Sequence, residues 1–206
     1  MPRGEVITRN IEKTVRTAET TRKTAETDIF VSINLDGEGM FEGASGNGFF
    51  DHMLTLFTRH SGFDLVMKAA GDTEVDFHHS AEDIGIALGK AIKDALDDCR
   101  GIARFADITL PMDEALVTVA LDISGRAYLS FGLPQLTSTV GEFDTELAEE
   151  FFSALVREAG LTLHIKLVSG KNTHHIIEAV FKAFGRVLGA GVKVVSDRIP
   201  STKGVI

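Results

Sequence analysis

Four of the seven histidines fall in two copies of the pattern His-His-x-x-Glu. The copies are His78, His79 and Glu82, and then His174, His175 and Glu178. In a helix the first histidine and the glutamate share a face at i and i+4, and the second histidine points about 100° away. One copy can therefore serve two metal ions, or one ion and a substrate. A single copy is typical of surface histidines beside a helix cap, but two copies at matching points of a repeated chain favour a metal site.

The nature of the ligands narrows the choice of metal. Imidazole nitrogens and carboxylates without sulfur suit Mn, Fe, Co, Ni or Zn, and an octahedral ion can take more ligands than the four of a typical zinc site. Cys99 is the only cysteine, which excludes a disulfide framework and a cysteine zinc site.

An internal repeat nominates a further pair of ligands. His52 lies 10 residues before Gly62, which ends a predicted helix, and 10 residues before the matching Gly160 the chain has Glu150. If His52 binds one ion, pseudo-symmetry places Glu150 at the other. Alone, His52 would be read as a buried, hydrogen-bonded histidine and Glu150 as a solvated helix residue.

Hydrophobic periodicity supports the same repeat. Strands are predicted at 29–35, 63–69, 116–124, 127–131 and 161–168, and helices at 50–60, 81–99, 146–159 and 176–188, with a Gly-rich loop at 43–48 and an irregular tail at 196–206. The prediction is an internally duplicated α+β fold, with two similar halves that each pack helices on one face of a mostly antiparallel sheet. The repeats span about 25–110 and 111–195 of a domain at 25–206, after a polar lead-in at 1–24.

Composition excludes several classes of partner. The 206 residues contain 21 Lys+Arg and 30 Asp+Glu, a net charge of −9, which argues against nucleic acid or an anionic membrane but still allows a small basic phosphate pocket. No window approaches 18 consecutive apolar residues, and the polar N-terminus is unlike a secretory signal. One free thiol suits a reducing cytoplasm.

Ordered motifs extend this pattern along most of the chain: GFFDHML, GDTEVDFHHSAEDIGIALG, NTHHIIEAVFKAFGR and IPSTKG. With them the chain resembles the imidazoleglycerol-phosphate dehydratase family from about Arg22 to Ile206. The resemblance implies dehydration of imidazole glycerol phosphate to imidazole acetol phosphate in histidine biosynthesis. It also implies two Mn²⁺ ions per active site and a homo-oligomer of 24 subunits with sites between subunits.

The resemblance also assigns roles to residues. The implied metal ligands are His52, His78, His79, Glu82, His174, His175 and Glu178, and Glu150 stands where the family usually has a further histidine. The implied catalytic residues are Glu26, the acid/base carboxylate, with His52, Glu82 and Glu178. The implied substrate contacts are Glu26, His52, His60 and Lys182, with Arg104, Arg126, Ser201 and Lys203 around the phosphate.

The expected chemistry explains why the ligand motif occurs twice. The hydrogen to be removed is not acidic, so the substrate imidazole must serve as the electron sink, and metal ions on both ring nitrogens would stabilise its anionic form. Glu26 or a metal-bound water would accept the proton. Two other interpretations stay open on the residues alone: a metallohydrolase acting on a phosphorylated or heterocyclic substrate, and a non-catalytic metal-binding or storage protein.

Overall fold

A computed structural model describes residues 15–133 and 136–206. The first half contains β1 (Thr17–Lys23), β2 (Thr27–Asn34), β3 (Phe41–Ala44), α1 (Gly48–Ser61), β4 (Asp64–Gly71) and α2 (His78–Leu96). The second contains β5 (Phe105–Met112), β6 (Ala115–Ile123), β7 (Tyr128–Gly132), α3 (Leu147–Ala159), β10 (Leu161–Ser169) and α4 (Thr173–Gly191). The short strands β8 (Thr139–Val140) and β9 (Phe143–Asp144) form a separate pair.

The two halves share one topology, which confirms the predicted duplication. The first sheet has the strand order β1-β2-β4-β3 and the second the order β5-β6-β10-β7. In each sheet the first two pairings are antiparallel and the last, β4 with β3 or β10 with β7, is parallel. The fold is therefore α+β with two mixed, mostly antiparallel sheets of equal strand order.

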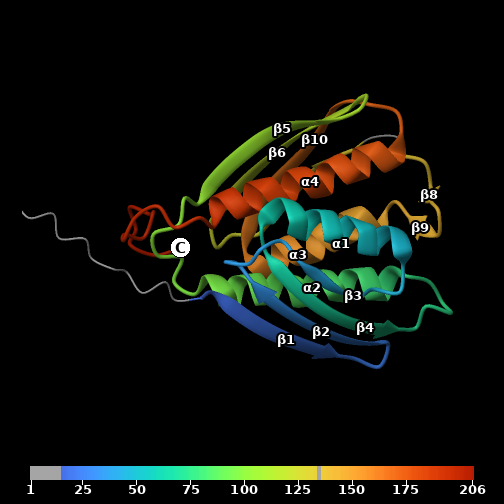
Figure 1. Ribbon diagram of the computed structural model, residues 1–206, viewed down its shortest axis with the longest axis horizontal. Helices are drawn as coiled ribbons and strands as arrows, with labels where there is room; N and C mark the ends of the chain where they lie inside the picture. The colour runs from blue at the N-terminus through green and yellow to red at the C-terminus, as the bar shows by residue number, and fades with distance from the viewer. Residues whose placement is uncertain (1–14, 134–135) are drawn as a thin grey trace, which may run out of the picture.

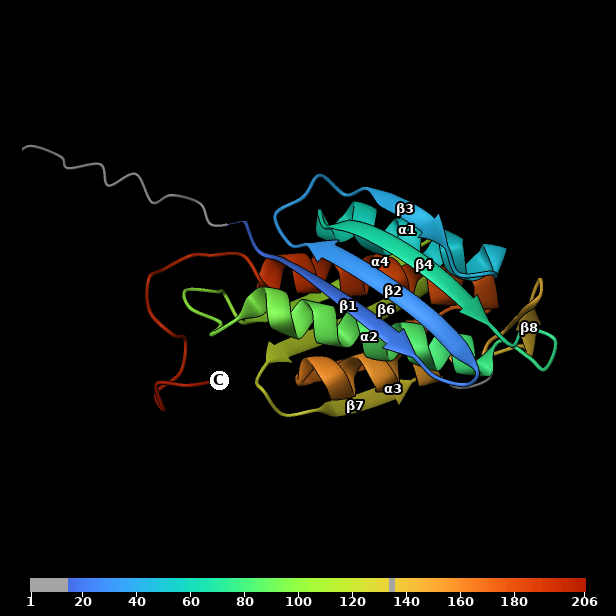
Figure 2. The same ribbon diagram turned by 90° about the horizontal axis from the view of Figure 1, so that it is seen from below.

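The four long helices lie between the two sheets (Figure 1). Helix α2 packs on β1 and β2, and α4 packs on β5 and β6. Across the middle of the molecule, α2 contacts α3 and α1 contacts α4, so each helix pair joins the two halves (Figure 2). The hydrophobic core fills the space between these layers, because each sheet turns one apolar face inward.

Phenylalanine side chains form the centre of this core. Phe57 stacks on Phe184 with ring centroids 5.5 Å apart, and Phe151 stacks on Phe181 at 5.6 Å. All four are nearly inaccessible to solvent. The first stack joins α1 to α4, and the second joins α3 to α4, so aromatic contacts fix the helices that carry the candidate site.

Glycines bring the helix pairs close together. A Cβ atom on Gly185 of α4 would lie 2.6 Å from the carbonyl oxygen of Phe57 in α1. A Cβ on Gly85 of α2 would lie 2.6 Å from the carbonyl oxygen of Phe151 in α3. Both approaches are backbone against backbone, so only glycine fits at these two crossings.

Local signals fix the ends of the helices. Asn47 caps α1 by accepting a hydrogen bond from the backbone N–H of Phe50, and Asn172 caps α4. Gly62 ends α1 and Gly160 ends α3, both in the left-handed conformation with φ of 80° and 67°. These two glycines are the pair on which the repeat was aligned in the sequence.

The structure differs from the sequence-based expectation at two strands of the first half. Thr17–Lys23 lies in the polar stretch expected to precede the folded domain, but it forms β1 and pairs along its length with β2. Phe41–Ala44 overlaps the expected loop at 43–48 and forms β3. Both are edge strands with largely exposed side chains, so their sequences carry little hydrophobic alternation. Residues 1–14 of the expected lead-in lie outside the described part of the chain.

A third strand, β5, had no counterpart in the sequence-based expectation, and the expected boundary between the repeats at 110/111 falls inside it. Its side chains alternate between exposed and half-buried. Within the described residues, no helix is both long and apolar enough to cross a membrane.

Candidate active site

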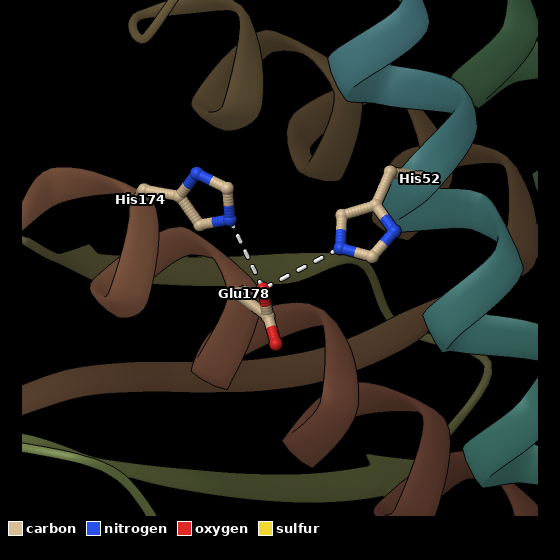
Figure 3. A group of neighbouring side chains, drawn as sticks. All are labelled: His52, His174 and Glu178. Carbon is tan, nitrogen blue, oxygen red and sulfur yellow. Dashed lines mark hydrogen bonds and ion pairs between the residues drawn. The ribbon is translucent and has the colours of Figure 1, made fainter.

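Three of the predicted ligands meet where α1 faces the beginning of α4 (Figure 3). Glu178 Oε2 lies 3.1 Å from Nε2 of His174, one helical turn earlier, and 3.5 Å from Nε2 of His52 in α1. One ligand atom from each residue lies within 4.8 Å of the other two, the only such group of three among residues 15–133 and 136–206. The Glu178 side chain is 9% exposed, whereas the two histidines are 48% and 43% exposed. A buried carboxylate and two accessible imidazoles are a donor set that suits a borderline divalent ion.

A cation stabilises the charge of this carboxylate. Lys182 Nζ lies 2.5 Å from Oε1 of Glu178, so the lysine binds one carboxylate oxygen and the histidines face the other. Burial acts to raise the pKa of Glu178, but Lys182 and the hydrogen bonds from His174 and His52 outweigh it and lower the pKa. Glu178 is therefore ionised, as a metal ligand must be.

His60 lies about two turns after His52 on α1, and it is close to the basic residues Lys182 and Arg186 of α4. Burial lowers the pKa of His60, and the charges of Lys182 and Arg186 lower it further. A neutral imidazole at this position can donate or accept a hydrogen bond without adding charge to the site.

The second histidine of the first motif points toward the turn between β1 and β2. His79 Nδ1 lies 3.0 Å from Oδ2 of Asp72, and its Nε2 lies 4.0 Å from Oε1 of Glu26. The hydrogen bond that His79 Nδ1 donates to Asp72 raises the pKa of His79. Buried Asp83 of α2 holds this turn in place by binding Arg22 (2.6 Å) and the hydroxyl of Thr27. Glu26 is thus fixed beside His79 by its neighbours in the hairpin.

The second histidine of the other motif has an equivalent contact. His175 Nδ1 lies 2.7 Å from Oε2 of Glu114, and its Nε2 lies 3.7 Å from Oδ2 of Asp113. Glu114 raises the pKa of His175, and His175 with the backbone N–H of Asn172 lowers the pKa of Glu114 to about 2. Sequence analysis singled out neither Asp72 nor Glu114. The only available signal was that Glu114, like Glu26, directly precedes an inner strand of its sheet.

The rest of the first motif is less closely assembled within one chain. Glu82 accepts a hydrogen bond from Arg157 of α3 at 3.3 Å rather than from His78. Glu150 is half-buried on α3, and among the described residues its carboxylate has no hydrogen-bond or ion-pair partner. Helix α3 nevertheless packs on α2 as α1 packs on α4. The sequence alignment of the two halves makes Glu150 and Glu82 the counterparts of His52 and Glu178.

The predicted phosphate contacts gather at the opposite end of α4. The backbone N–H of Arg104 donates to the carbonyl of Gly191, the last residue of the helix, at 2.8 Å. Its guanidinium binds Asp122 at 2.7 Å and the carbonyl oxygen of Pro200 at 2.8 Å, next to Ser201.

The other two members lie near the same tail. The backbone N–H of Lys203 donates to the Ser201 hydroxyl at 3.2 Å, and a Cβ on Gly125, which precedes Arg126, would lie 3.0 Å from the backbone of Ile206. Figure 1 shows this tail beyond the C-terminal end of α4. The His52–His174–Glu178 group lies at the beginning of the same helix.

Fold and site together define a class of protein: a duplicated α+β protein with a histidine–carboxylate group, between its helices, that could hold a metal ion. The sequence profile of imidazoleglycerol-phosphate dehydratase matches residues 45–188. The chain belongs to the imidazoleglycerol-phosphate dehydratase family. It is a hydro-lyase that acts in histidine biosynthesis, so the metallohydrolase and storage-protein interpretations are wrong.

Relatives of this family cover nearly the whole chain. The imidazoleglycerol-phosphate dehydratase of Desulforamulus reducens is 55% identical over 195 residues, which cover 93% of this chain and 98% of the relative. The crystal structure of the enzyme from Staphylococcus aureus is similar with a TM-score of 0.79 and 45% identity, covering 87% of this chain and 99% of that one. The enzyme from Pyrococcus furiosus, solved in complex with (S)-C348, has a TM-score of 0.79 and 39% identity and covers 91% and 100%.

Proposed function

We propose that imidazole glycerol phosphate is dehydrated at a site with two Mn²⁺ ions, one of which is held by His52, His174 and Glu178. The observation that carries the proposal is the convergence of these three residues from two helices, with one donor atom of each within 4.8 Å of the others. Two imidazoles and a carboxylate leave further positions of an octahedral ion free for substrate. The two motif copies, each with two histidines, support a pair of ions rather than one.

The second set of ligands is proposed to be His78, Glu82 and Glu150, with His79 and His175 completing the two sites. The equal strand orders of the two sheets support this pairing, because they make α2 and α3 the counterparts of α4 and α1. Glu82 would exchange its contact with Arg157 for the ion. Arg157 is 53% exposed, so losing this ion pair costs little.

Bound divalent ions would supply Lewis-acid stabilisation of negative charge on the substrate imidazole. The protein would provide the proton acceptor, and Glu26 is the candidate for that role. Its side chain is 54% exposed and lies at the end of the β1–β2 turn, on the Nε2 side of His79. Lys182 would keep Glu178 ionised throughout the reaction, and His60 would offer a neutral hydrogen-bonding group to the substrate.

The phosphate is proposed to bind to Arg104, Arg126, Ser201 and Lys203, and these would come from another subunit. Helix α4 separates Arg104 from His174 by about 25 Å, at 1.5 Å per residue. One small substrate cannot span that length, so in this proposal a neighbouring chain would bring its phosphate pocket to the metal ligands. This requirement supports a homo-oligomer with shared sites, which the family resemblance implies to be a 24-mer.

Metal content and substrate turnover, measured with matched histidine variants, test the proposal. His174→Ala should lower the bound Mn²⁺ per chain and abolish turnover of imidazole glycerol phosphate. His164→Ala is the control, because His164 is an exposed strand residue outside the cluster. Wild-type metal content and turnover in His174→Ala would contradict the proposed site.

A further inference from the structure

We propose that Asp72 and Glu114 are positioning residues, each of which holds the second histidine of one His-His-x-x-Glu motif through Nδ1 and leaves Nε2 without a hydrogen bond among the described residues. The Nε2 atom lies 4.0 Å from Glu26 in His79 and 3.7 Å from Asp113 in His175. The inference rests on the proposed metal site, in which His79 and His175 are ligands. Neither carboxylate belongs to the predicted ligand set. Their role would be to orient a ligand rather than to bind the ion.

The geometry is the same at both histidines. Asp72 lies 3.0 and 3.2 Å from Nδ1 of His79 through its two oxygens, and Glu114 lies 2.7 Å from Nδ1 of His175. An ionised carboxylate only accepts hydrogen bonds, so Nδ1 must be the donor in each pair. The neutral ring then carries its proton on Nδ1, and the lone pair of Nε2 is available to an ion.

Backbone hydrogen bonds hold both residues in place. The other oxygen of Glu114 accepts from the backbone N–H groups of Asn172 at 2.8 Å and Lys171 at 3.3 Å, in the loop that leads into α4. The backbone N–H of Asp72 donates to the carbonyl of Glu26 at 3.1 Å. The Glu114 side chain and the Asp72 backbone are therefore anchored to the loops that shape the site.

The two halves achieve this contact with different residues. Glu26 directly precedes β2, and Glu114 directly precedes β6, the corresponding strand of the second half. Asp72 directly follows β4, whereas the residue that follows the corresponding β10 is Gly170. Gly170 has a φ of +139°, and a Cβ there would lie 2.9 Å from Cα of Ala115. No side chain fits at that position. In the second half, Glu114, in the turn between β5 and β6, contacts the histidine instead.

This difference explains why, of the two glutamates in the β1–β2 and β5–β6 turns, Glu26 is not held by side-chain hydrogen bonds within the described part of the chain whereas Glu114 is. In the second half, Glu114 is engaged by His175 and by the backbone before α4. In the first half, Asp72 accepts the hydrogen bond from Nδ1 of His79. Glu26 stays exposed on the other side of the ring, 4.0 Å from Nε2. Asp72 would thus position His79 and leave Glu26 available to the substrate.

Mn²⁺ titration of the metal-free full-length chain, followed by electron paramagnetic resonance, tests the inference. Loss of a partner that orients a metal-bound histidine typically weakens metal affinity about 10–100-fold. Asp72→Ala and Glu114→Ala should each show a loss of that size. Glu114→Gln should recover part of it, because the amide oxygen can still accept from Nδ1. Glu74→Gln is the control, since Glu74 is exposed near Asp72 and has no side-chain partner among the described residues.

The outcomes separate this inference from the proposed function. If the wild-type chain binds no Mn²⁺, the metal site itself is wrong. If the wild type binds Mn²⁺ and both alanine variants match Glu74→Gln, the positioning role is wrong and the metal site stands. Should an alanine variant fail to fold, Asp72→Asn and Glu114→Gln carry the test: each should bind Mn²⁺ more weakly than Glu74→Gln, and equal affinity would overturn the inference.

Discussion

Replacing Gly185 by alanine should disturb both the packing of α1 on α4 and the His52–His174–Glu178 group that this packing creates. The new Cβ would lie 2.6 Å from the carbonyl oxygen of Phe57, whereas real Cβ contacts almost never fall below 3.0 Å. The helices must therefore separate locally by at least the difference, 0.4 Å. No change of rotamer can relieve the contact, because the atom it meets belongs to the backbone. His52 sits on the same helix as Phe57, so it would move relative to Glu178.

The expected magnitudes follow from this displacement. Overpacking of a tight contact costs about 1–3 kcal/mol, and the higher helix propensity of alanine returns about 1 kcal/mol. A net loss of about 1 kcal/mol lowers the Tm of a chain of this size by roughly 2–4 °C. Metal–ligand distances tolerate only about 0.2 Å, so a 0.4 Å movement of His52 should weaken Mn²⁺ binding by on the order of tenfold.

Thermal unfolding in the presence of a chelator and Mn²⁺ titration would measure the two effects separately. Gly48→Ala is the control: Gly48 begins α1 with open space around it, so alanine there should leave the Tm equal or higher. Gly85→Ala is a comparison: it makes an equal backbone contact between α2 and α3, so it should cost similar stability and spare His52, while any loss of Mn²⁺ should come from the proposed ligands Glu82 and Glu150 on those helices. Gly185→Ala with wild-type Tm and wild-type metal affinity would refute the reasoning.

Three further predictions concern the remaining parts of the site. Arg104→Ala should raise the KM about 10–100-fold through loss of a charge-assisted contact, with metal content unchanged; Arg100→Ala, which removes an exposed ion pair, is the control. Glu150→His should keep activity but shift metal preference toward Co, Ni or Zn, while Glu150→Ala should lose metal, as elemental analysis and assays with each ion would show. If the sites are shared between subunits, as proposed, metal binding would be coupled to assembly, so chelation should lower the mass seen by light scattering; an unchanged mass would count against shared sites.

The duplicated fold was accessible from the sequence because its core elements carry strong periodic signals. Helices α1 to α4 and the inner strands β2, β4, β6 and β10 each bury one face, and Gly62 and Gly160 end helices in both halves. The edge strands β1, β3 and β5 lacked this signal because few of their side chains are buried. Their place in the sheets is determined by backbone pairing with a neighbouring strand.

The residue types of the His52–His174–Glu178 group could be predicted from the sequence, but the partners of the individual side chains could not. Spacing alone placed His174 and Glu178 on one helical face, and they lie 3.1 Å apart. The same spacing holds for His78 and Glu82, yet Glu82 binds Arg157 instead. Side-chain partners depend on what the neighbouring helix presents, and the motif carries no information about that helix.

The contacts that hold His79 and His175 could not be predicted from the sequence for a related reason. The two halves have sheets of equal strand order, but the loops that lead from each sheet to the helix with the His-His-x-x-Glu motif differ in length. They span 72–77 before α2 and 170–172 before α4. The longer loop contains Asp72 and brings it to His79, whereas the shorter loop passes from Gly170 directly to the helix cap and leaves His175 to Glu114. The difference in loop length thus accompanies a difference in partner: Glu114 lies within hydrogen-bond distance of His175, whereas Glu26 stays exposed at 4.0 Å from His79.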